Sequence, residues 1–198
     1  DNRVSALPEV ETVQQAIDAL SLRQGNCCTF VVSPGPGWEE VFQRIAPNQN
    51  AEICFQAGTY SVPGRVLVAN KGHLRLLGVG PGSRLVATAS ESVLFFQNCL
   101  SVTLEHLHAE ASPASASGVQ ITGLNGILTF VNCLGVDVTR LSLRSAPGTS
   151  RTATCITVRH ASSSADAATR TSVRVVACHF EVGHEPVSYT HLRAHETK

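Results

Sequence analysis

Six polar side chains stand at matching places in similar short segments of this sequence and could form one binding surface. They are Arg75, His108, Asp137, Arg140, Arg174 and His179. Guanidinium and imidazole groups donate hydrogen bonds, and a carboxylate accepts them. Such a set fits a polar groove for an acidic sugar, or a site that uses one side chain as a general base. The competing interpretation is an ordinary solvated face, where strand alternation places polar residues by default.

Paired carboxylates, which the hydrolysis of a glycosidic bond requires, are missing from the sequence. The four aspartates are Asp1, Asp18, Asp137 and Asp166, and no two of them are neighbours. A calcium site needs several oxygen ligands, whereas only Asp137 lies in a repeated segment. We therefore predict no catalytic residue, no metal and no cofactor.

Other candidate motifs are weaker. The glycine-rich run Gly78–Ser83 is followed by a strand pattern, where a dinucleotide-binding loop requires a helix. The seven cysteines form no CxxC motif and have apolar flanks, so we expect buried reduced side chains rather than a disulfide framework. Cys27 and Cys28 could act as a reactive thiol pair, although nothing electropositive flanks them.

Composition limits the classes of partner. The 198 residues are 43% hydrophobic and 15% charged, and fifteen basic residues balance fifteen acidic ones. A neutral chain with two lysines is unsuited to binding nucleic acid or an anionic membrane surface. No apolar run approaches the roughly eighteen residues of a membrane span. The length suits one domain with a sizeable core.

The first fifty residues predict helices. Apolar residues that recur every three or four positions predict a helix over residues 8–22. A β-branched run predicts a strand over residues 28–32, and the residues Trp38–Ile45 predict a second, short helix. We interpret residues 1–50 as an N-terminal helical segment that caps the remainder of the chain.

From residue 51 onward the sequence consists of short strand patterns and contains an internal repeat. Phe96–Ala109 aligns with Phe130–Leu143 at identical offsets, and weaker copies occur at Leu74–Val79 and Val173–Phe180. The shared pattern is a strand with alternating apolar residues, a two-residue corner, and a second such strand. Repeats of this kind stack through parallel strand pairing and share one core.

Stacking of the repeats predicts which residues meet. Val102 and Val136 must lie opposite each other on neighbouring strands, and Asp137 is expected to pair with Arg174 on the outward face. The predicted core residues are Leu74, Leu76, Val102, Leu104, Leu107, Val136, Val138, Leu141, Leu143, Val173, Val175 and Phe180.

The corners of the repeat should also stack. The second corner residue is Gly78, His106, Arg140 and Ala177 in the successive copies. The segments Asn98–Cys99 and Asn132–Cys133 lie at equivalent positions and should stack on each other. We expect their cysteines to fill a core column rather than to form a bond.

The run Ala51–Tyr60, which ends in Ala-Gly-Thr-Tyr, resembles the first coil of pectin-lyase-like right-handed parallel β-helix proteins. Leu76–Gly80 is similar to the second corner of that superfamily, and the likeness over residues 28–186 is closest to uncharacterised bacterial repeat proteins. The resemblance implies a mainly β fold: a right-handed parallel β-helix (solenoid) over residues 51–186, with the short N-terminal helices as its cap. That fold hosts lyases, hydrolases, epimerases, adhesins and tailspikes.

The hydrolases of this superfamily carry Asn-Thr-Asp, Gly-His-Gly and Arg-Ile-Lys segments, and this sequence contains none of them. We therefore expect a non-catalytic β-helix scaffold, or a module of a larger bacterial protein that binds a polysaccharide or a cell-surface glycan. The alternative is a polysaccharide lyase or hydrolase of the pectin-lyase-like superfamily whose catalytic coils lie beyond this fragment. An extracellular or cell-surface location is compatible with both.

Both ends of the chain are unusual. The sequence lacks methionine and begins with aspartate, which we interpret as the loss of a leader or as an internal start. Residues 187–198 look like a translated sequencing adapter, so we interpret them as a non-native tail that truncates the β-helix after Pro186. For the same reason His191 and His195, although spaced like metal ligands on a helix, predict no zinc site. The strand at residues 173–180 should then be an uncovered edge.

Overall fold

A computed structural model describes the chain over residues 28–87, 92–111, 126–145, 154–159 and 171–182. The predicted helix at residues 8–22 and the tail at residues 187–198 lie outside the described residues.

The described part of the chain is mainly β, as predicted, and its strands form three parallel sheets. Sheet A contains β1 (Phe30–Val32), β2 (Ala51–Phe55), β5 (His73–Leu77), β8 (Ser101–Glu105), β11 (Gly135–Thr139) and β14 (Ser172–Val176). Sheet B contains β3 (Gly58–Val62), β6 (Ser83–Ala87), β9 (His108–Ala111), β12 (Ser142–Ser145) and β15 (His179–Val182). Sheet C contains β4 (Val66–Ala69), β7 (Leu94–Gln97), β10 (Gly126–Val131) and β13 (Thr154–Arg159).

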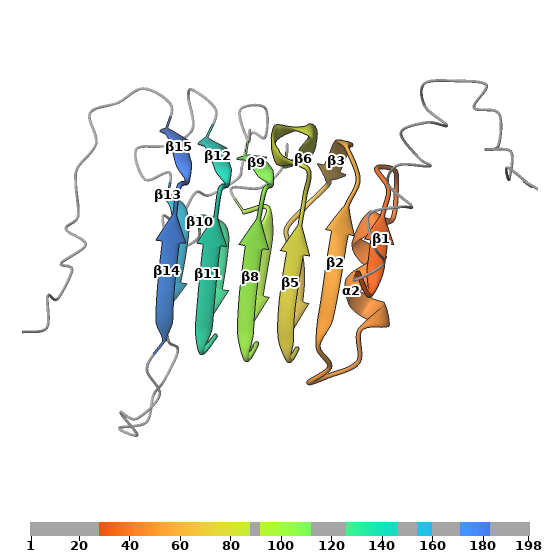
Figure 1. Cartoon of the computed structure of the whole chain (residues 1–198), viewed down its shortest axis with the longest axis vertical. Coiled ribbons are helices and arrows are strands. Elements are labelled where there is room, and N and C mark those ends of the chain that lie inside the picture. The colour runs from red at the N-terminus through yellow and green to blue at the C-terminus, as the bar shows by residue number, and fades with distance from the viewer. Residues whose placement is uncertain (1–27, 88–91, 112–125, 146–153, 160–170, 183–198) are drawn as a thin grey trace, which may run out of the picture.

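From β2 onward the chain passes through sheets A, B and C in a fixed rotation, and each passage adds one strand to each sheet. The strands of sheet A lie side by side in the order β14, β11, β8, β5 and β2, with β1 and α2 beyond β2 (Figure 1). This order is compatible with a β-helix or another solenoid. No helix among the described residues is both long enough and apolar enough to cross a membrane.

The predicted register of the repeat is confirmed. Val136 lies opposite Val102, which in turn lies opposite Leu74 on β5. On the next pair of strands, β11 and β14, Asp137 lies opposite Arg174. The apolar-x-apolar pattern fixes this register, because a slip of one residue would turn every buried side chain of a strand outward.

Asparagines form a hydrogen-bonded ladder where the chain leaves sheet C. Asn70, Asn98 and Asn132 have φ values of 56°, 54° and 53°, in the left-handed region that asparagine tolerates better than most residues. The side-chain amide of Asn98 donates to Oδ1 of Asn70 at 3.1 Å, and that of Asn132 donates to Oδ1 of Asn98 at 3.2 Å. The predicted stacking at this corner is therefore confirmed. The neighbouring Cys99 and Cys133 are buried and form no disulfide, as expected.

The corner between sheets A and B uses the same backbone conformation. His106, Arg140 and Ala177 have φ values of 54°, 53° and 52°. Gly78 stands at the equivalent place in the preceding repeat, where its N–H donates to the carbonyl of Glu105 at 2.9 Å. A Cβ atom at Gly78 would collide with the carbonyl oxygen of His106. Three copies of this corner therefore have a residue of positive φ, and the fourth copy, at Gly78, has no space for a side chain.

Alternate residues of the strands point into a single hydrophobic cluster. Phe96 and Phe130 stack at its centre, with ring centroids 5.2 Å apart and ring planes 8° apart. Nine of the twelve predicted core residues are buried: Leu74, Leu76, Val102, Leu104, Leu107, Val136, Val138, Leu141 and Leu143.

The prediction was wrong for Val173, Val175 and Phe180, which are 48%, 44% and 44% exposed. In the described part of the chain, β14 and β15 are the last strands of sheets A and B. No described strand pairs with their far sides, so alternation alone does not bury their inward residues. The separate expectation of an uncovered edge at residues 173–180 agrees with this position.

A short helical segment packs against the other end of the hydrophobic cluster. It consists of the 3-10 turn η1 (Trp38–Glu40) and the helix α2 (Val41–Arg44), close to the predicted range. Trp38 makes edge-to-face contacts with Phe42, Phe55 and Tyr60, and its indole N–H donates to the carbonyl of Ser61 at 2.8 Å. Through these contacts Trp38 covers Phe55 on β2 of sheet A and Tyr60 on β3 of sheet B.

Tyr60 makes this end of the fold sensitive to alkaline pH. Its side chain is fully buried, and its hydroxyl oxygen lies 2.8 Å and 2.9 Å from the carbonyl oxygens of Val32 and Gln56. Burial raises the pKa of Tyr60 to about 12. Because this pKa is higher in the folded than in the unfolded chain, the stabilisation is fully present below about pH 10.

We expect that stabilisation, on the order of 2 kcal/mol, to be lost as the pH rises from about 10 to 12. Denaturant unfolding across this range, alongside absorbance titration of tyrosinate, measures the loss. In the Tyr60→Phe variant, the part of the alkaline loss in unfolding free energy that is due to Tyr60 should be absent. An identical alkaline decline in wild type and Tyr60→Phe would contradict the assignment.

Candidate functional site

Charged side chains line the outer face of sheet A and form the surface that we call the charged row. Its members are Glu52, Arg75, Glu105, Asp137 and Arg174. They come from five neighbouring strands, β2, β5, β8, β11 and β14. Parallel strands lie about 4.8 Å apart, so long side chains at equivalent positions reach each other. Of these five residues, the sequence singled out Arg75, Asp137 and Arg174.

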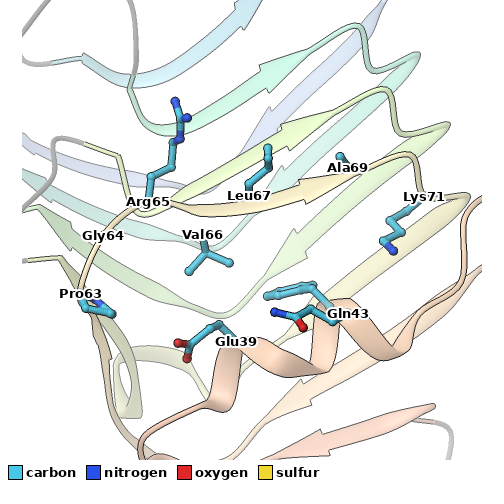
Figure 2. A pocket seen from close by; sticks show the side chains of 10 residues that line it. Glu39, Gln43, Pro63, Gly64, Arg65, Val66, Leu67, Ala69 and Lys71 are labelled. Atoms are coloured by element: carbon cyan, nitrogen blue, oxygen red, sulfur yellow. The ribbon is translucent and has the colours of Figure 1, made fainter.

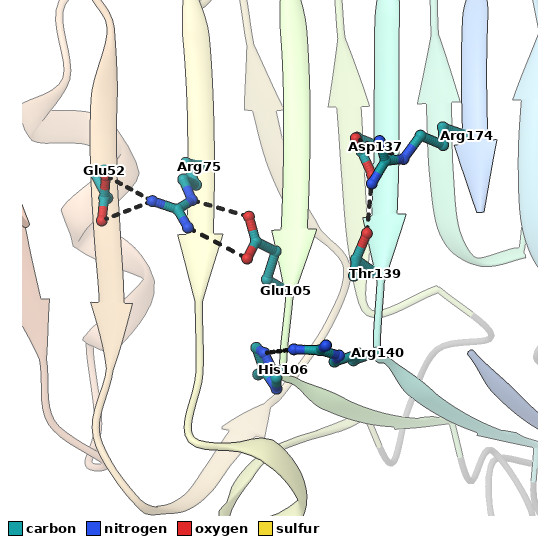
Figure 3. Close-up of polar contacts among 8 residues, drawn as sticks. All are labelled: Glu52, Arg75, Glu105, His106, Asp137, Thr139, Arg140 and Arg174. Atoms are coloured by element: carbon teal, nitrogen blue, oxygen red, sulfur yellow. Dashed lines mark hydrogen bonds and ion pairs between the residues drawn. The ribbon is translucent and has the colours of Figure 1, made fainter. Parts of the chain in front are cut away.

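Arg75 lies between two carboxylates (Figure 3). Its Nε and Nη2 donate to the two carboxylate oxygens of Glu105 at 3.0 Å and 3.2 Å, and its Nη1 lies 3.4 Å from both oxygens of Glu52. Hydrogen bonds from Arg75 lower the pKa of Glu105, and the same bonds raise the pKa of the guanidinium. The arginine therefore stays charged and is compensated on both sides.

Asp137 and Arg174 form the ion pair that the repeat predicted. Arg174 Nε lies 3.3 Å from Oδ2 of Asp137, and the Thr139 hydroxyl donates to Oδ1 of the same carboxylate at 3.0 Å. Both oxygens of Asp137 are thus engaged. An exposed pair of this type contributes about 0–1 kcal/mol to stability, so its main effect is to orient the side chains.

Arg140 lies at the corner between sheets A and B and contacts a residue that the site prediction did not include. Its Nη1 donates to Nε2 of His106 at 3.3 Å, which requires that nitrogen to carry a lone pair. Figure 3 shows these two side chains next to the charged row. They connect the polar surface of sheet A with that of sheet B.

The outer face of sheet B carries a second polar group. His108 and His179 both align with Ser142, as the repeat predicted. Glu110 Oε2 lies 3.3 Å from Nη2 of Arg84 and 3.6 Å from Nε2 of His108. On this face too, an arginine and a carboxylate from neighbouring strands are paired.

The six predicted residues therefore do not form one cluster but are divided between two sheets and the corner that joins them. Arg75, Asp137 and Arg174 lie on sheet A, His108 and His179 lie on sheet B, and Arg140 lies between the two sheets. The glutamates that pair with them, Glu52, Glu105 and Glu110, were missed. The signal for Glu105 was present: Thr103 lies opposite Arg75, and Glu105, two residues further along the strand, shares its face.

Within the charged row, Glu105 is poorly suited to act as a catalytic acid. A glycosidase needs one carboxyl group that stays protonated near neutral pH, whereas Arg75 lowers the pKa of Glu105. Asp137 is held by a hydroxyl donor and by Arg174.

Between Gly78 and β6 the structure has only the short 3-10 turn η2 (Gly80–Gly82), so the helix required for a dinucleotide site is absent there.

One cysteine prediction was wrong. Cys28 and Cys54 form a disulfide that joins the segment before β1 to β2, with their Cα atoms 5.9 Å apart. Ile53 and Phe55, which flank Cys54, are buried, so Cys54 itself faces the opposite side of the strand. Its apolar flanks therefore indicated an outward thiol rather than a buried one. Of the proposed thiol pair, Cys28 is oxidised and Cys27 lies outside the described residues.

A cavity of about 380 Å³ lies away from these polar faces, between α2 and the edge strand β4. Glu39 and Gln43 line it from the helical side, and Val66 contributes apolar surface from β4 (Figure 2). Lys71 also lines it, and its Nζ donates to the carbonyl of Ile45, at the end of α2. None of the six predicted site residues lines this cavity.

Comparison with known proteins gives no match: no protein-family model, no curated protein and no solved structure is significantly similar to this chain. The resemblance to pectin-lyase-like proteins therefore stays a prediction. The candidate site rests on the geometry of the charged row and of the polar face of sheet B.

Proposed function

We propose that this chain is a right-handed parallel β-helix scaffold of the pectin-lyase-like type, and that the outer faces of sheets A and B bind a glycan without transforming it. The rotation of the chain through three parallel sheets supports the fold, together with the corner residues of positive φ that recur along the chain. The observation that carries the function is the charged row, in which arginines and carboxylates pair across neighbouring strands.

The pairing favours a neutral glycan over an acidic one. Two carboxylates contact Arg75, and Asp137 contacts Arg174, so neither guanidinium is an uncompensated positive charge. Sugar hydroxyls both donate and accept hydrogen bonds, and they match a surface on which guanidinium donors and carboxylate acceptors lie side by side. The regular strand spacing places such polar groups at intervals along the face, which suits an extended polymer of similar units.

The alternative is a polysaccharide lyase or hydrolase of the same superfamily. Such an enzyme would need a catalytic acid or base that is not already engaged in an ion pair, whereas the carboxylates of the charged row are paired with arginines. The same argument makes the non-catalytic proposal the better supported one for the described residues.

Binding to immobilised neutral polysaccharides and to polyuronides tests the proposal. We expect the wild-type chain to bind a neutral polysaccharide, and Arg75→Gln to lower the affinity at least about tenfold, since a lost hydrogen bond to a charged group is worth about 1.5–3 kcal/mol. Arg65→Gln is the matched control, because Arg65 stacks on the ring of Phe95, away from the charged row.

Three results would contradict the proposal. Equal binding by wild type and Arg75→Gln would show that the charged row is not part of the binding site. Binding restricted to polyuronides would contradict the neutral ligand. Turnover of any polysaccharide by the purified chain would show that it is an enzyme and would support the alternative.

A further inference from the structure

Three side chains near the N-terminal end of sheet A bring two sulfur atoms and a carboxylate together. Each of Cys28, Glu52 and Cys54 offers one potential ligand atom, and these atoms all lie within 4.8 Å of one another. Glu52 and Cys54 are two residues apart on β2 and share its outer face, while Cys28 lies just before the paired strand β1. Among the described residues this is the one group of histidine, cysteine and acidic side chains with that geometry.

We propose that reduction of the Cys28–Cys54 disulfide converts this group into a zinc-binding site, with both thiolates and the Glu52 carboxylate as ligands. Thiolate sulfur and carboxylate oxygen are both established ligands of Zn²⁺, and three protein ligands leave the fourth tetrahedral position to water. Softer thiolate ligands favour zinc over calcium or magnesium, which prefer oxygen.

The geometry requires only small movements of the side chains. Two sulfurs on a tetrahedral zinc, each about 2.3 Å from the metal, are about 3.8 Å apart. The Cα separation of 5.9 Å lets rotation about the cysteine side-chain bonds supply that distance without moving the strands. The required backbone arrangement is thus already present in the oxidised form.

Glu52 can turn toward a metal without leaving Arg75 unpaired. The contacts from Arg75 to Glu52 are 3.4 Å long, whereas the contacts to Glu105 are 3.0 Å and 3.2 Å and engage both carboxylate oxygens. Arg75 therefore keeps its closer partner when Glu52 moves. The backbone N–H of Glu52 also donates to the hydroxyl of Thr29 at 3.0 Å, which holds β2 next to the residue after Cys28.

The site is open to both reductant and metal. All three side chains are only partly buried. A dithiol supplies two electrons and two protons and is itself oxidised to a disulfide, whereas a phosphine supplies two electrons and becomes a phosphine oxide while water supplies the oxygen and the two protons. Either reductant cleaves the S–S bond and yields two thiols. Zinc then displaces one proton from each thiol as the two Zn–S bonds form. The same pair of cysteines would thus exist as a disulfide in oxidising surroundings and as a metal site in reducing ones.

The experiment is a Zn²⁺ titration of the full chain, fully reduced with a phosphine or kept oxidised, against a chromogenic chelator. We expect one Zn²⁺ per reduced chain and at least a hundredfold weaker binding by the oxidised chain. Cys28→Ser and Cys54→Ser should abolish the strong binding, and Glu52→Gln should weaken it about tenfold or more. Calorimetry in buffers of different ionisation enthalpy should show the release of about two protons per zinc.

Cys178→Ser is the matched control, since Cys178 is a partly buried free thiol on another part of the fold. It should leave the affinity unchanged. Co²⁺ gives a second readout: a thiolate-to-cobalt charge-transfer band should appear with the reduced wild type and be absent when both thiols are alkylated. Strong zinc binding that survives in Cys54→Ser, equal binding by the oxidised chain, or no binding by the reduced and folded wild type would each overturn the proposal.

Discussion

Replacement of Phe96 by alanine is expected to lower the free energy of unfolding by about 3–5 kcal/mol. Phe96 is fully buried and stacks on Phe130 from the next strand of sheet C, with ring centroids 5.2 Å apart. The substitution removes apolar surface and leaves a cavity between strands that cannot close up without moving the neighbouring passages. Equilibrium unfolding in denaturant measures the loss.

Phe180→Ala is the matched control for this prediction. Phe180 is 44% exposed on β15, and its truncation should cost less than about 1 kcal/mol. The double variant Phe96→Ala/Phe130→Ala should be less destabilised than the sum of the two single variants, because aromatic pairs are worth about 0.5–1.5 kcal/mol beyond their buried area. Equal losses for Phe96→Ala and Phe180→Ala would show that the stack does not lie at the centre of the core.

The parts of the fold that depend on local pattern were predictable. The repeat placed Val102 opposite Val136 and Asp137 opposite Arg174, because alternation and repeat spacing together fix the register of parallel strands. Burial at the end of a sheet depends instead on the strand that comes next. The same pattern that correctly predicted Leu104 as buried therefore failed for Val175.

The candidate site was predictable only in part, because it consists of contacts between strands that are far apart in sequence. The pairing of Arg75 with Glu105 is diagonal: Arg75 lies opposite Thr103, and its long side chain reaches two residues further along β8. Position in the repeat gives the opposite residue, whereas the direction of a flexible side chain is set by the charges around it. Glu105 was missed for this reason. Glu52, by contrast, lies directly opposite Arg75, and it was missed because the earliest recognised copy of the repeat begins at Leu74.

The disulfide shows how a flanking pattern can be misinterpreted. Apolar neighbours on both sides of Cys54 suggested a buried thiol. In a strand, however, neighbours at i−1 and i+1 face the side opposite to residue i. The buried positions of Ile53 and Phe55 therefore place Cys54 outward, where it reaches Cys28 in the segment before β1. The separation of 26 residues between the two cysteines depends on the length of one passage, which the sequence pattern did not define at that end.

Asn98→Val is expected to lower the free energy of unfolding by about 2–3 kcal/mol. Asn98 has a φ of 54°, and its side chain is the middle member of the ladder that joins Asn70, Asn98 and Asn132. A β-branched residue in the left-handed region is strained by about 1–3 kcal/mol. The loss of two side-chain hydrogen bonds adds less than their usual value of about 0.5–1.5 kcal/mol each, because Asn98 is exposed to solvent.

Asn98→Gly separates these two causes. Glycine adopts a positive φ without strain, so this variant loses the ladder but keeps the corner, and we expect a loss below about 1 kcal/mol. The unfolding free energies of both variants, measured by denaturant titration, therefore give the strain as their difference. If Asn98→Val and Asn98→Gly are equally destabilised, the left-handed backbone at this corner is not what selects asparagine. The hydrogen-bonded ladder would then be its main contribution to the stacking of successive strands.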